Sequence, residues 1–329
     1  MESEGRCNSV KLADLSRRDF VKGAVACAGL GAFAGSSLRA ADKMQEGIQV
    51  RFLGSGCAKW DPAWLKDNPF VRRQASVLVD DRVLIDFTAC GFDMLPEGCC
   101  PEALFLTHSH GDHYNPDAIV RVGVKSVYAQ ETWAAAARKE LSVAAQRLSR
   151  PAPAVIALPF GQAVEACGLR VTGVPANHST GRVTDGVLER TSIYLVEKGP
   201  SRLLYATDTG GIPGDAARMI GIDPHYNEKN WQPGNPFVAR PRPLTGLIME
   251  ATNGNMDEDY RMFFHSSVQT VSRTVNMLSA RGLYVPAEGQ SVYLTHLGGK
   301  YRRLPAEQVD AELPPGIRAA SDGQVVTFK

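Results

Sequence analysis

The chain lacks the features that would place it on nucleic acid or across a membrane. Its 36 lysine and arginine residues are almost balanced by 35 aspartate and glutamate residues, which leaves a net charge of +1. Proteins that bind nucleic acid usually carry a clear basic excess on the binding domain. After residue 40 no apolar run approaches the roughly 20 residues that a helix needs to span a bilayer. We therefore expect no nucleic-acid partner and no membrane span in this part of the chain.

Cysteine is too sparse to define a scaffold. Of the seven cysteines, five lie after residue 40, and no pair of them has the CxxC spacing of zinc and redox motifs. They are Cys57, Cys90, Cys99, Cys100 and Cys167. A disulfide remains possible in an oxidising compartment, but the spacing names none.

The first 40 residues are predicted to be an export signal. Residues 16–22 read SRRDFVK, which matches the twin-arginine pattern, and an apolar stretch rich in glycine and alanine covers residues 23–35. That stretch is too short for a mature membrane helix, and small residues suited to cleavage follow it at 38–41. We expect the twin-arginine machinery to export the folded, metal-loaded protein to the periplasm. The alternative is a basic amphipathic tail.

Histidine is also rare, yet it is concentrated. Three of the seven histidines lie in the run THSHGDH, which follows the apolar segment 103–107 and contains His108, His110, Asp112 and His113. A strand that ends in such a run presents several imidazoles and a carboxylate to one point, as catalytic divalent metals require. The alternative is a polar loop after a buried strand.

Further ligand candidates stand alone at the ends of later strand-like segments. They are His178 after 169–174, Asp208 after 202–206 and His296 after 291–294. Active-site residues commonly lie where a strand gives way to a loop. Asp86, in the apolar run VLIDF, is expected to accept a hydrogen bond from a ligand histidine, with a cap or turn residue as the alternative.

The spacing His-x-His-x-Asp-His resembles the signature of the metallo-β-lactamase superfamily. The resemblance implies an α+β fold, the αβ/βα four-layer sandwich, and a centre of two divalent ions, Zn²⁺ or Mn²⁺. It assigns His108, His110 and His178 to one ion, Asp112, His113 and His296 to the other, and Asp208 as the bridge.

The pattern of apolar segments fits such a sandwich, because strands and helices occur in two successive series. Strands are expected at 48–53, 76–79, 82–87, 103–106 and 126–129, then at 162–166, 169–174, 191–197, 202–206, 247–249 and 292–294, with helices at 131–148 and 267–281. We expect one domain over 41–329. The proline-rich, aperiodic segment 211–246 is predicted to be a lid over the site.

Within the superfamily the chain is similar to the phosphoribosyl cyclic phosphodiesterases of bacterial phosphonate degradation. The similarity lies in RRQ at 72–74, PANHS at 175–179, TDTGGIP at 207–213, FHS at 264–266 and LTH at 294–296. It implies that His265 protonates the leaving oxygen, although a structural histidine at a helix start is the alternative. Arg72 and Arg73 are candidates to hold a further phosphate or carboxylate of the substrate, or are simply surface charges.

The sequence therefore predicts an exported dinuclear metallohydrolase that cleaves a small phosphodiester, cyclic or linear, with Asp112, Asp208 and His265 taking part in catalysis. One alternative is a lactone or carboxylic-ester hydrolase on the same centre, which would tolerate loss of His265 better. The other is a metal-bound binding protein without catalysis. The cysteine cluster that holds a structural zinc in the phosphonate enzymes is missing here, which leaves the substrate open.

Overall fold

The computed structural model describes residues 46–223, 241–256 and 260–329. The predicted export signal at 1–40 lies outside the described residues, and so does the 224–240 part of the segment expected to form a lid. Within the described ranges, no helix is both long and apolar enough to cross a membrane. All five cysteines found there are without a disulfide partner.

The first sheet has seven strands in the order β16-β1-β2-β3-β4-β5-β6. Their bounds are β1 Ile48–Gly54, β2 Ser76–Val79, β3 Val83–Ile85, β4 Ala103–Phe105, β5 Ser126–Gln130, β6 Ala154–Leu158 and β16 Val325–Phe328. Strands β3 to β6 are parallel, whereas β16, β1, β2 and β3 pair antiparallel. Parallel neighbours need crossovers, and helices α2 (Pro116–Val122) and α3 (Ala134–Leu148) provide two of them.

The second sheet repeats this plan in the order β15-β14-β13-β12-β11-β8-β7. Its strands are β7 Ala163–Ala166, β8 Leu169–Pro175, β11 Ser192–Lys198, β12 Ser201–Ala206, β13 Gly246–Glu250, β14 Val292–Thr295 and β15 Ile317–Ala319. Strands β12 to β15 are parallel. Their crossovers contain α4 (Gly214–Met219), α5 (Val268–Ala280) and α6 (Ala306–Asp310).

Two short features lie outside the sheets and matter for the site. The segment between β1 and β2 contains α1 (Trp64–Asp67), and the segment after β14 contains the 3₁₀ helix η4 (Gly299–Arg303). A small hairpin, β9 (Val183–Thr184) and β10 (Val187–Leu188), interrupts the path from β8 to β11.

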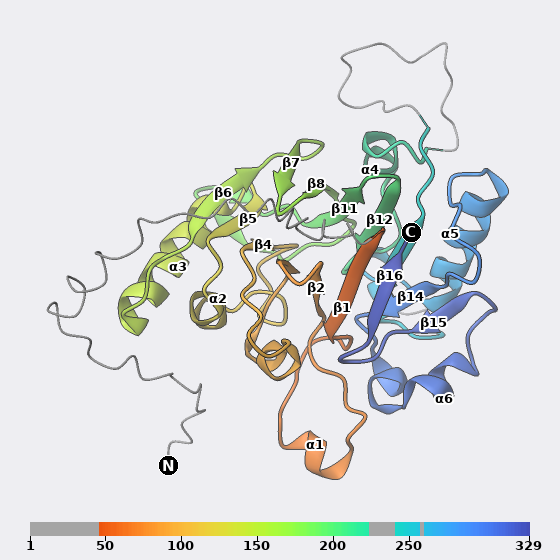
Figure 1. Cartoon of the computed structure of the whole chain (residues 1–329), viewed down its shortest axis with the longest axis horizontal. Helices are drawn as coiled ribbons and strands as arrows, with labels where there is room; N and C mark the ends of the chain where they lie inside the picture. The colour runs from red at the N-terminus through yellow and green to blue at the C-terminus, as the bar shows by residue number, and fades with distance from the viewer. Residues whose placement is uncertain (1–45, 224–240, 257–259) are drawn as a thin grey trace, which may run out of the picture. The chain divides into compact units, whose positions relative to one another are not determined.

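Three apolar clusters show how the layers stack. One cluster joins the facing sides of the two sheets and includes Phe52, Phe105, Tyr194 and Tyr205. A second packs α2 and α3 onto the outer face of the first sheet, and a third packs α4 and α5 onto the outer face of the second. In Figure 1, α3 and α5 accordingly lie on opposite sides of the strands. The four-layer αβ/βα sandwich predicted from the sequence is confirmed.

The predicted strands and the two long helices agree with the structure to within a few residues. The pattern missed five strands, β6, β9, β10, β15 and β16. Strand β6 lies between Pro153 and Pro159, just after the helix expected at 131–148. It forms the edge of its sheet, where proline nearby is tolerated because one side of the strand needs no partner.

Candidate metal centre

The candidate site is assembled where strands of both sheets end. The histidine run follows β4, His178 follows β8, Asp208 follows β12 and His296 follows β14. Asp86, Asp208 and His296 adopt left-handed backbone conformations, with φ values of 56°, 45° and 50°. Non-glycine residues seldom occupy this region, and they concentrate at functional sites where the surrounding fold enforces the strain. The chain therefore turns sharply at the point where each of these side chains enters the site.

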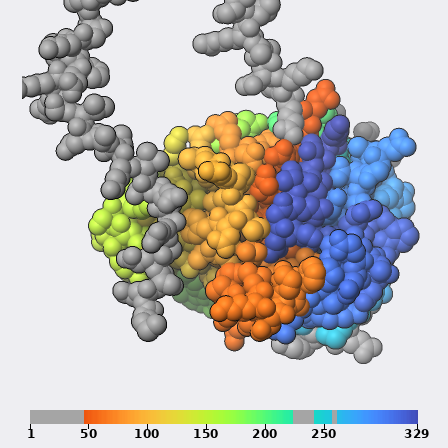
Figure 2. All heavy atoms as spheres, turned by 60° about the horizontal axis from the view of Figure 1, so that its bottom comes forward, coloured from red at the N-terminus to blue at the C-terminus, as the bar shows by residue number. Residues whose placement is uncertain are grey.

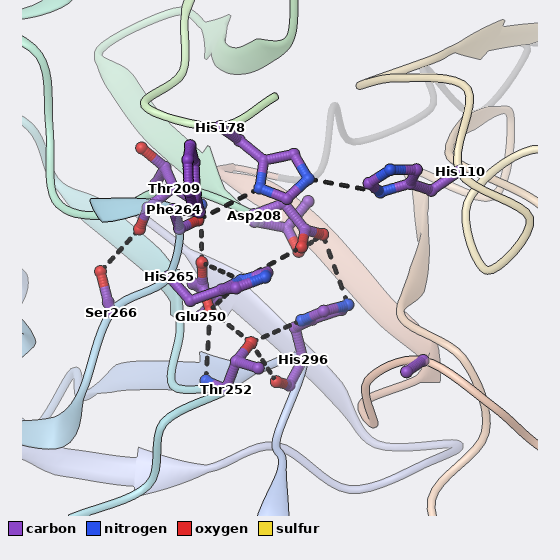
Figure 3. A network of polar contacts seen from close by, with 12 residues as sticks. His110, His178, Asp208, Thr209, Glu250, Thr252, Phe264, His265, Ser266 and His296 are labelled. Carbon is purple, nitrogen blue, oxygen red and sulfur yellow. Dashed lines mark hydrogen bonds and ion pairs between the residues drawn. The ribbon is translucent and has the colours of Figure 1, made fainter. Parts of the chain in front are cut away.

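The structure brings all seven residues predicted as ligands into one cluster. Ligand atoms lie within 4.8 Å of one another in each of three groups: His108, His110 and His178; Asp112, His113 and His296; and His108, His113 and Asp208. The third group joins the other two, because it shares His108 with the first and His113 with the second. Asp208 Oδ2 lies 2.7 Å from His113 Nε2 and 3.3 Å from His296 Nε2, and a ligand atom of Asp208 also lies within 4.8 Å of one of His178. Figure 3 shows Asp208 between His178 and His296. The position of Asp208 is the one that a bridging carboxylate would need.

The outer hydrogen bonds of the histidines decide which ring nitrogen faces the cluster. Thr252 Oγ1 donates to Glu250 and thus accepts from Nδ1 of His296, 2.7 Å away. His113 Nδ1 donates to Asp86 Oδ2 at 2.7 Å, and His178 Nδ1 to the carbonyl oxygen of Phe264 at 3.2 Å. In each ring Nε2 is then left facing inward, as metal ligation requires.

The outer hydrogen bond of His108 also turns its Nε2 toward the cluster, and His110 completes the set of imidazoles. Thr107 Oγ1 donates to Asp86 Oδ2 and therefore accepts from Nδ1 of His108, 2.9 Å away. The inward Nε2 of His108 lies 3.0 Å from Nδ1 of His110, which is itself 3.3 Å from Nε2 of His178. Nitrogen lone pairs that meet this closely repel unless a proton or a cation lies between them. The donor set therefore fits a bound cation.

The charge states also suit divalent ions. Burial lowers the pKa of His108 well below its usual value and that of His178 to about 4, so both rings stay neutral. Burial alone would raise the pKa of Asp208, but the charges of His296 and His113 outweigh it and hold this carboxyl ionised. Burial lowers the pKa of His113, but the charges of Asp208, Asp112 and Asp86 raise it well above its usual value, so an ion bound here would displace a proton from that ring. Neutral imidazoles and ionised carboxylates are the ligands that zinc and manganese accept. The residues present fit a two-metal centre.

His265 lies beside the cluster and has a partner that the sequence analysis missed. Its Nδ1 lies 3.0 Å from Glu250 Oε1 and 3.3 Å from Asp208 Oδ1 (Figure 3). Burial lowers the pKa of His265, but the hydrogen bond and charge of Glu250, with the charge of Asp208, raise it above its usual value overall. Among the described residues its Nε2 makes no hydrogen bond. His265 is thus oriented by one nitrogen and has the other available for a proton transfer.

Glu250 and Glu189 are buried carboxylates that support the site. Glu250 is fully buried and accepts hydrogen bonds from the backbone N–H groups of Thr209 and Thr252. Glu189 accepts from the backbone N–H and the hydroxyl of Ser109, at 2.7 and 2.6 Å, within the histidine run. Glu250 ends the apolar strand GLIME, the same signal that singled out Asp86. A buried acid at a strand end could therefore have been noticed.

Asp86 and the two arginines differ in how their predicted roles fit the structure. Asp86 is fully buried and holds His113, as described above. Arg72 does not fit a substrate contact. It is 4% exposed, and its guanidinium donates to the carbonyl oxygens of Tyr301, Ala320 and Leu304. Arg73 instead forms ion pairs of 3.6 Å with Asp93 and Asp322 and lies over the ring of Trp60.

Comparison with known proteins identifies the fold. Residues 99–235 match the profile of a family described as the beta-lactamase superfamily domain. No curated protein matches the sequence significantly. With 22% identity and a TM-score of 0.55, a diphosphatase of the PhnP family aligns over 86% of this chain and 98% of its own.

Other solved structures also have a fold similar to that of this chain. Zn²⁺-bound PqqB from Methylobacterium extorquens has 18% identity and a TM-score of 0.57, covering 85% of this chain and 100% of its own. Human tRNase Z, short form, has 14% identity and a TM-score of 0.55, covering 85% and 99%. The chain has the metallo-β-lactamase fold.

Proposed function

We propose that the protein is a dinuclear metallohydrolase that cleaves a small phosphodiester and uses His265 as general acid. The observation that carries the proposal is the pairing of His265 with Glu250 directly beside the seven clustered ligands. A simple metal-binding protein has no need of an oriented titratable group there. Known proteins of this fold with comparable TM-scores include a diphosphatase and a tRNase Z, which act on phosphate esters or anhydrides by name.

The residues of the site have three proposed roles: binding the ions, orienting the ligand histidines and donating a proton. His108, His110 and His178 would hold one ion, Asp112, His113 and His296 the other, and Asp208 would contact both. Two divalent ions bound there would lower the pKa of a shared water and offset the charge of the phosphoryl oxygens. Asp86, Thr252 and Glu250 keep the ligand rings in one tautomer and orientation. His265, held at Nδ1 by Glu250, would give a proton from Nε2 to the departing oxygen.

The test separates protonation from mere ordering of the site. We expect His265→Ala to keep its metal content and to lose roughly a hundredfold or more in turnover, the usual scale of acid catalysis. The loss should be largest for alkoxide leaving groups and small for nitrophenolate, which leaves without a proton. The measurement is turnover of wild type and variant across phosphodiesters of graded leaving-group pKa. Equal losses for every leaving group would contradict the proton-donor role.

A carboxylic-ester or lactone hydrolase is the second candidate, and one observation favours it. Phe263 and Phe264 are 65% and 44% exposed beside the site, with Met262 next to them, and an apolar substrate would contact them well. Such an enzyme should cleave lactones faster than phosphodiesters and retain most of its activity in His265→Ala. Assaying wild type and variant on matched lactone and phosphodiester substrates decides between the two candidates.

We also propose export by the twin-arginine pathway, on the strength of the SRRDFVK run followed by an apolar stretch. Changing Arg17 and Arg18 to lysine should leave the protein in the cytoplasm. Cell fractionation measures this, and unchanged periplasmic accumulation of the double variant would exclude the pathway.

A further inference from the structure

Two segments of the chain extend from the metal centre and meet beside it. The first follows β1: the backbone N–H of Ala58 donates to Asp112 Oδ2 at 2.8 Å. The second follows β14: Leu297, next to His296, pairs with Gly56 of the first segment. In Figure 2 the orange residues around α1 accordingly lie against the blue C-terminal part on one face. The side chains of these two segments are thus neighbours of the proposed ligand Asp112.

Arg302, at the end of η4, carries hydrogen-bond donors that have no acceptor. Its guanidinium stacks on the ring of Trp64 at 4.9 Å, while its Nε and Nη2 atoms are buried and make no hydrogen bond to any described residue. Buried polar atoms in native proteins are almost always paired, so an orphaned charged group needs an explanation. Arg72 shows the contrast, because each of its nitrogens donates to an acceptor.

The neighbours of Arg302 add further donors. Arg73 Nε and the indole Nε1 of Trp60 are likewise buried without a hydrogen bond, and the Arg73 guanidinium lies 5.6 Å from the Trp60 ring centroid. The other two guanidinium nitrogens of Arg73 form ion pairs of 3.6 Å with Asp93 and Asp322. The backbone N–H of Arg72 donates to the carbonyl oxygen of Arg302 at 3.1 Å, so the chain at Arg73 runs beside the chain at Arg302. Clustered N–H donors on stacked, oriented guanidinium groups are what recognises a carboxylate or a phosphate.

Electrostatics link this cluster to the metal centre. Burial lowers the pKa of Arg302, and the charge of Asp112 opposes that shift. Among the described residues Arg302 forms no ion pair, so its charge is balanced only at a distance. An anion bound by Arg302 would therefore lie next to the metal ion that Asp112 would bind.

We propose that Arg302, with Arg73 and Trp60, binds a second anionic group of the substrate beside the metal centre. That group is a phosphoryl or a carboxylate. The reaction assigned to the substrate rests on the proposed function, but the anion site itself does not. The substrate class is then a phosphodiester that carries at least one further negative charge remote from the bond that is cleaved.

The binding test uses calorimetric titration of the metal-loaded protein with inorganic phosphate and, separately, with malonate. We expect at least one probe to show a binding event that Arg302→Met weakens tenfold or more and Arg302→Lys weakens partially. Arg303→Met is the matched control, because Arg303 is exposed and stacks on the same Trp64 at 5.7 Å. It should bind both probes as the wild type does. Identical isotherms for wild type and Arg302→Met with both probes would overturn the proposal.

Thermal unfolding tests whether the role of Arg302 is purely structural. Because two nitrogens of Arg302 make no bond in the folded protein, Arg302→Met should melt at or above the wild-type temperature. Arg72→Met should melt clearly lower. If Arg302→Met melts as low as Arg72→Met, Arg302 serves the fold and the proposal is wrong.

A kinetic comparison separates the anion site from the reaction. Two aryl phosphodiesters with the same leaving group are compared, one with a neutral methyl group and one with a phosphate or carboxylate on the other ester. Arg302→Met should raise KM at least tenfold for the charged substrate and leave the neutral one unchanged. If wild type cleaves neither, the proposed function fails while the calorimetry still decides the anion site. Equal KM changes for both substrates would overturn the specificity role.

Discussion

The two halves of the proposed metal centre are supported in different ways. In the half formed by His108, His110 and His178, no ring contacts a buried carboxylate through its outer nitrogen: His108 reaches Asp86 only through the hydroxyl of Thr107, and His178 donates to a backbone carbonyl. Two of these three residues are partly exposed. In the other half, the contacts of His113 and His296 lead to the buried carboxylates of Asp86 and Glu250. This second half also includes the carboxylate Asp112.

The difference has a direct electrostatic meaning. A carboxylate behind a ligand histidine makes the imidazole more basic and fixes its orientation, and such partners typically change metal affinity by 10–100-fold. A carboxylate ligand adds further attraction for a dication. We therefore expect the half with His113 and His296 to bind its ion more tightly than the half with His108, His110 and His178.

Removing Asp208, the residue that both halves share, should have the largest effect, because both ions would lose a ligand. Asp208→Ala takes away the one carboxylate that contacts both, so we expect metal content to fall by about half or more and turnover to fall below detection. Elemental analysis of purified wild type and variant measures the metals. A wild type that folds well yet holds one ion or none would refute the two-metal arrangement, and Asp208→Asn controls for the side-chain volume.

A more selective change should affect one half more than the other. Asp86→Asn removes the negative charge that His113 contacts directly, so we expect that ion to bind roughly 10–100-fold more weakly. The other ion should be weakened less, because His108 reaches Asp86 only through Thr107. Competition with a chelator, followed by metal analysis at each chelator concentration, resolves the two affinities. Equal weakening of both ions would show that the halves are not supported independently. Asp81→Asn, at an exposed turn, is the control.

The smallest expected effect concerns the indirect link to Glu250. Thr252→Val keeps the shape of the side chain but removes the hydroxyl between His296 and Glu250, so we expect a loss of about tenfold in affinity for the same ion. Thr252→Ser retains the hydroxyl and should behave as wild type in the same chelator competition. If valine and serine variants are alike, the hydroxyl does not support His296.

The parts of this molecule that were predictable are those encoded locally. The histidine run and the strand-like segments stand out because ligands and apolar alternation lie within a few residues. The acidic end of the strand GLIME was a local signal for Glu250, but its pairing with His265, 15 residues away, had no short-range signal. Arg72 and Arg73 are chemically identical neighbours, and only tertiary packing places one among carbonyl oxygens and the other on Trp60. Arg302 belongs to no sequence motif that would have marked it as a binding residue.

The pairing of β1 with β16 has a consequence for synthesis. Ile48 lies opposite Phe328, so the strand made near the start of the described chain stays without its outer neighbour until almost everything else has been translated. Contacts between residues so distant in sequence slow folding, and an unpaired strand edge is prone to aggregation meanwhile. During synthesis the first sheet would thus be incomplete until β16 has left the ribosome, and shielding of the β1 edge until then would raise the yield of folded protein.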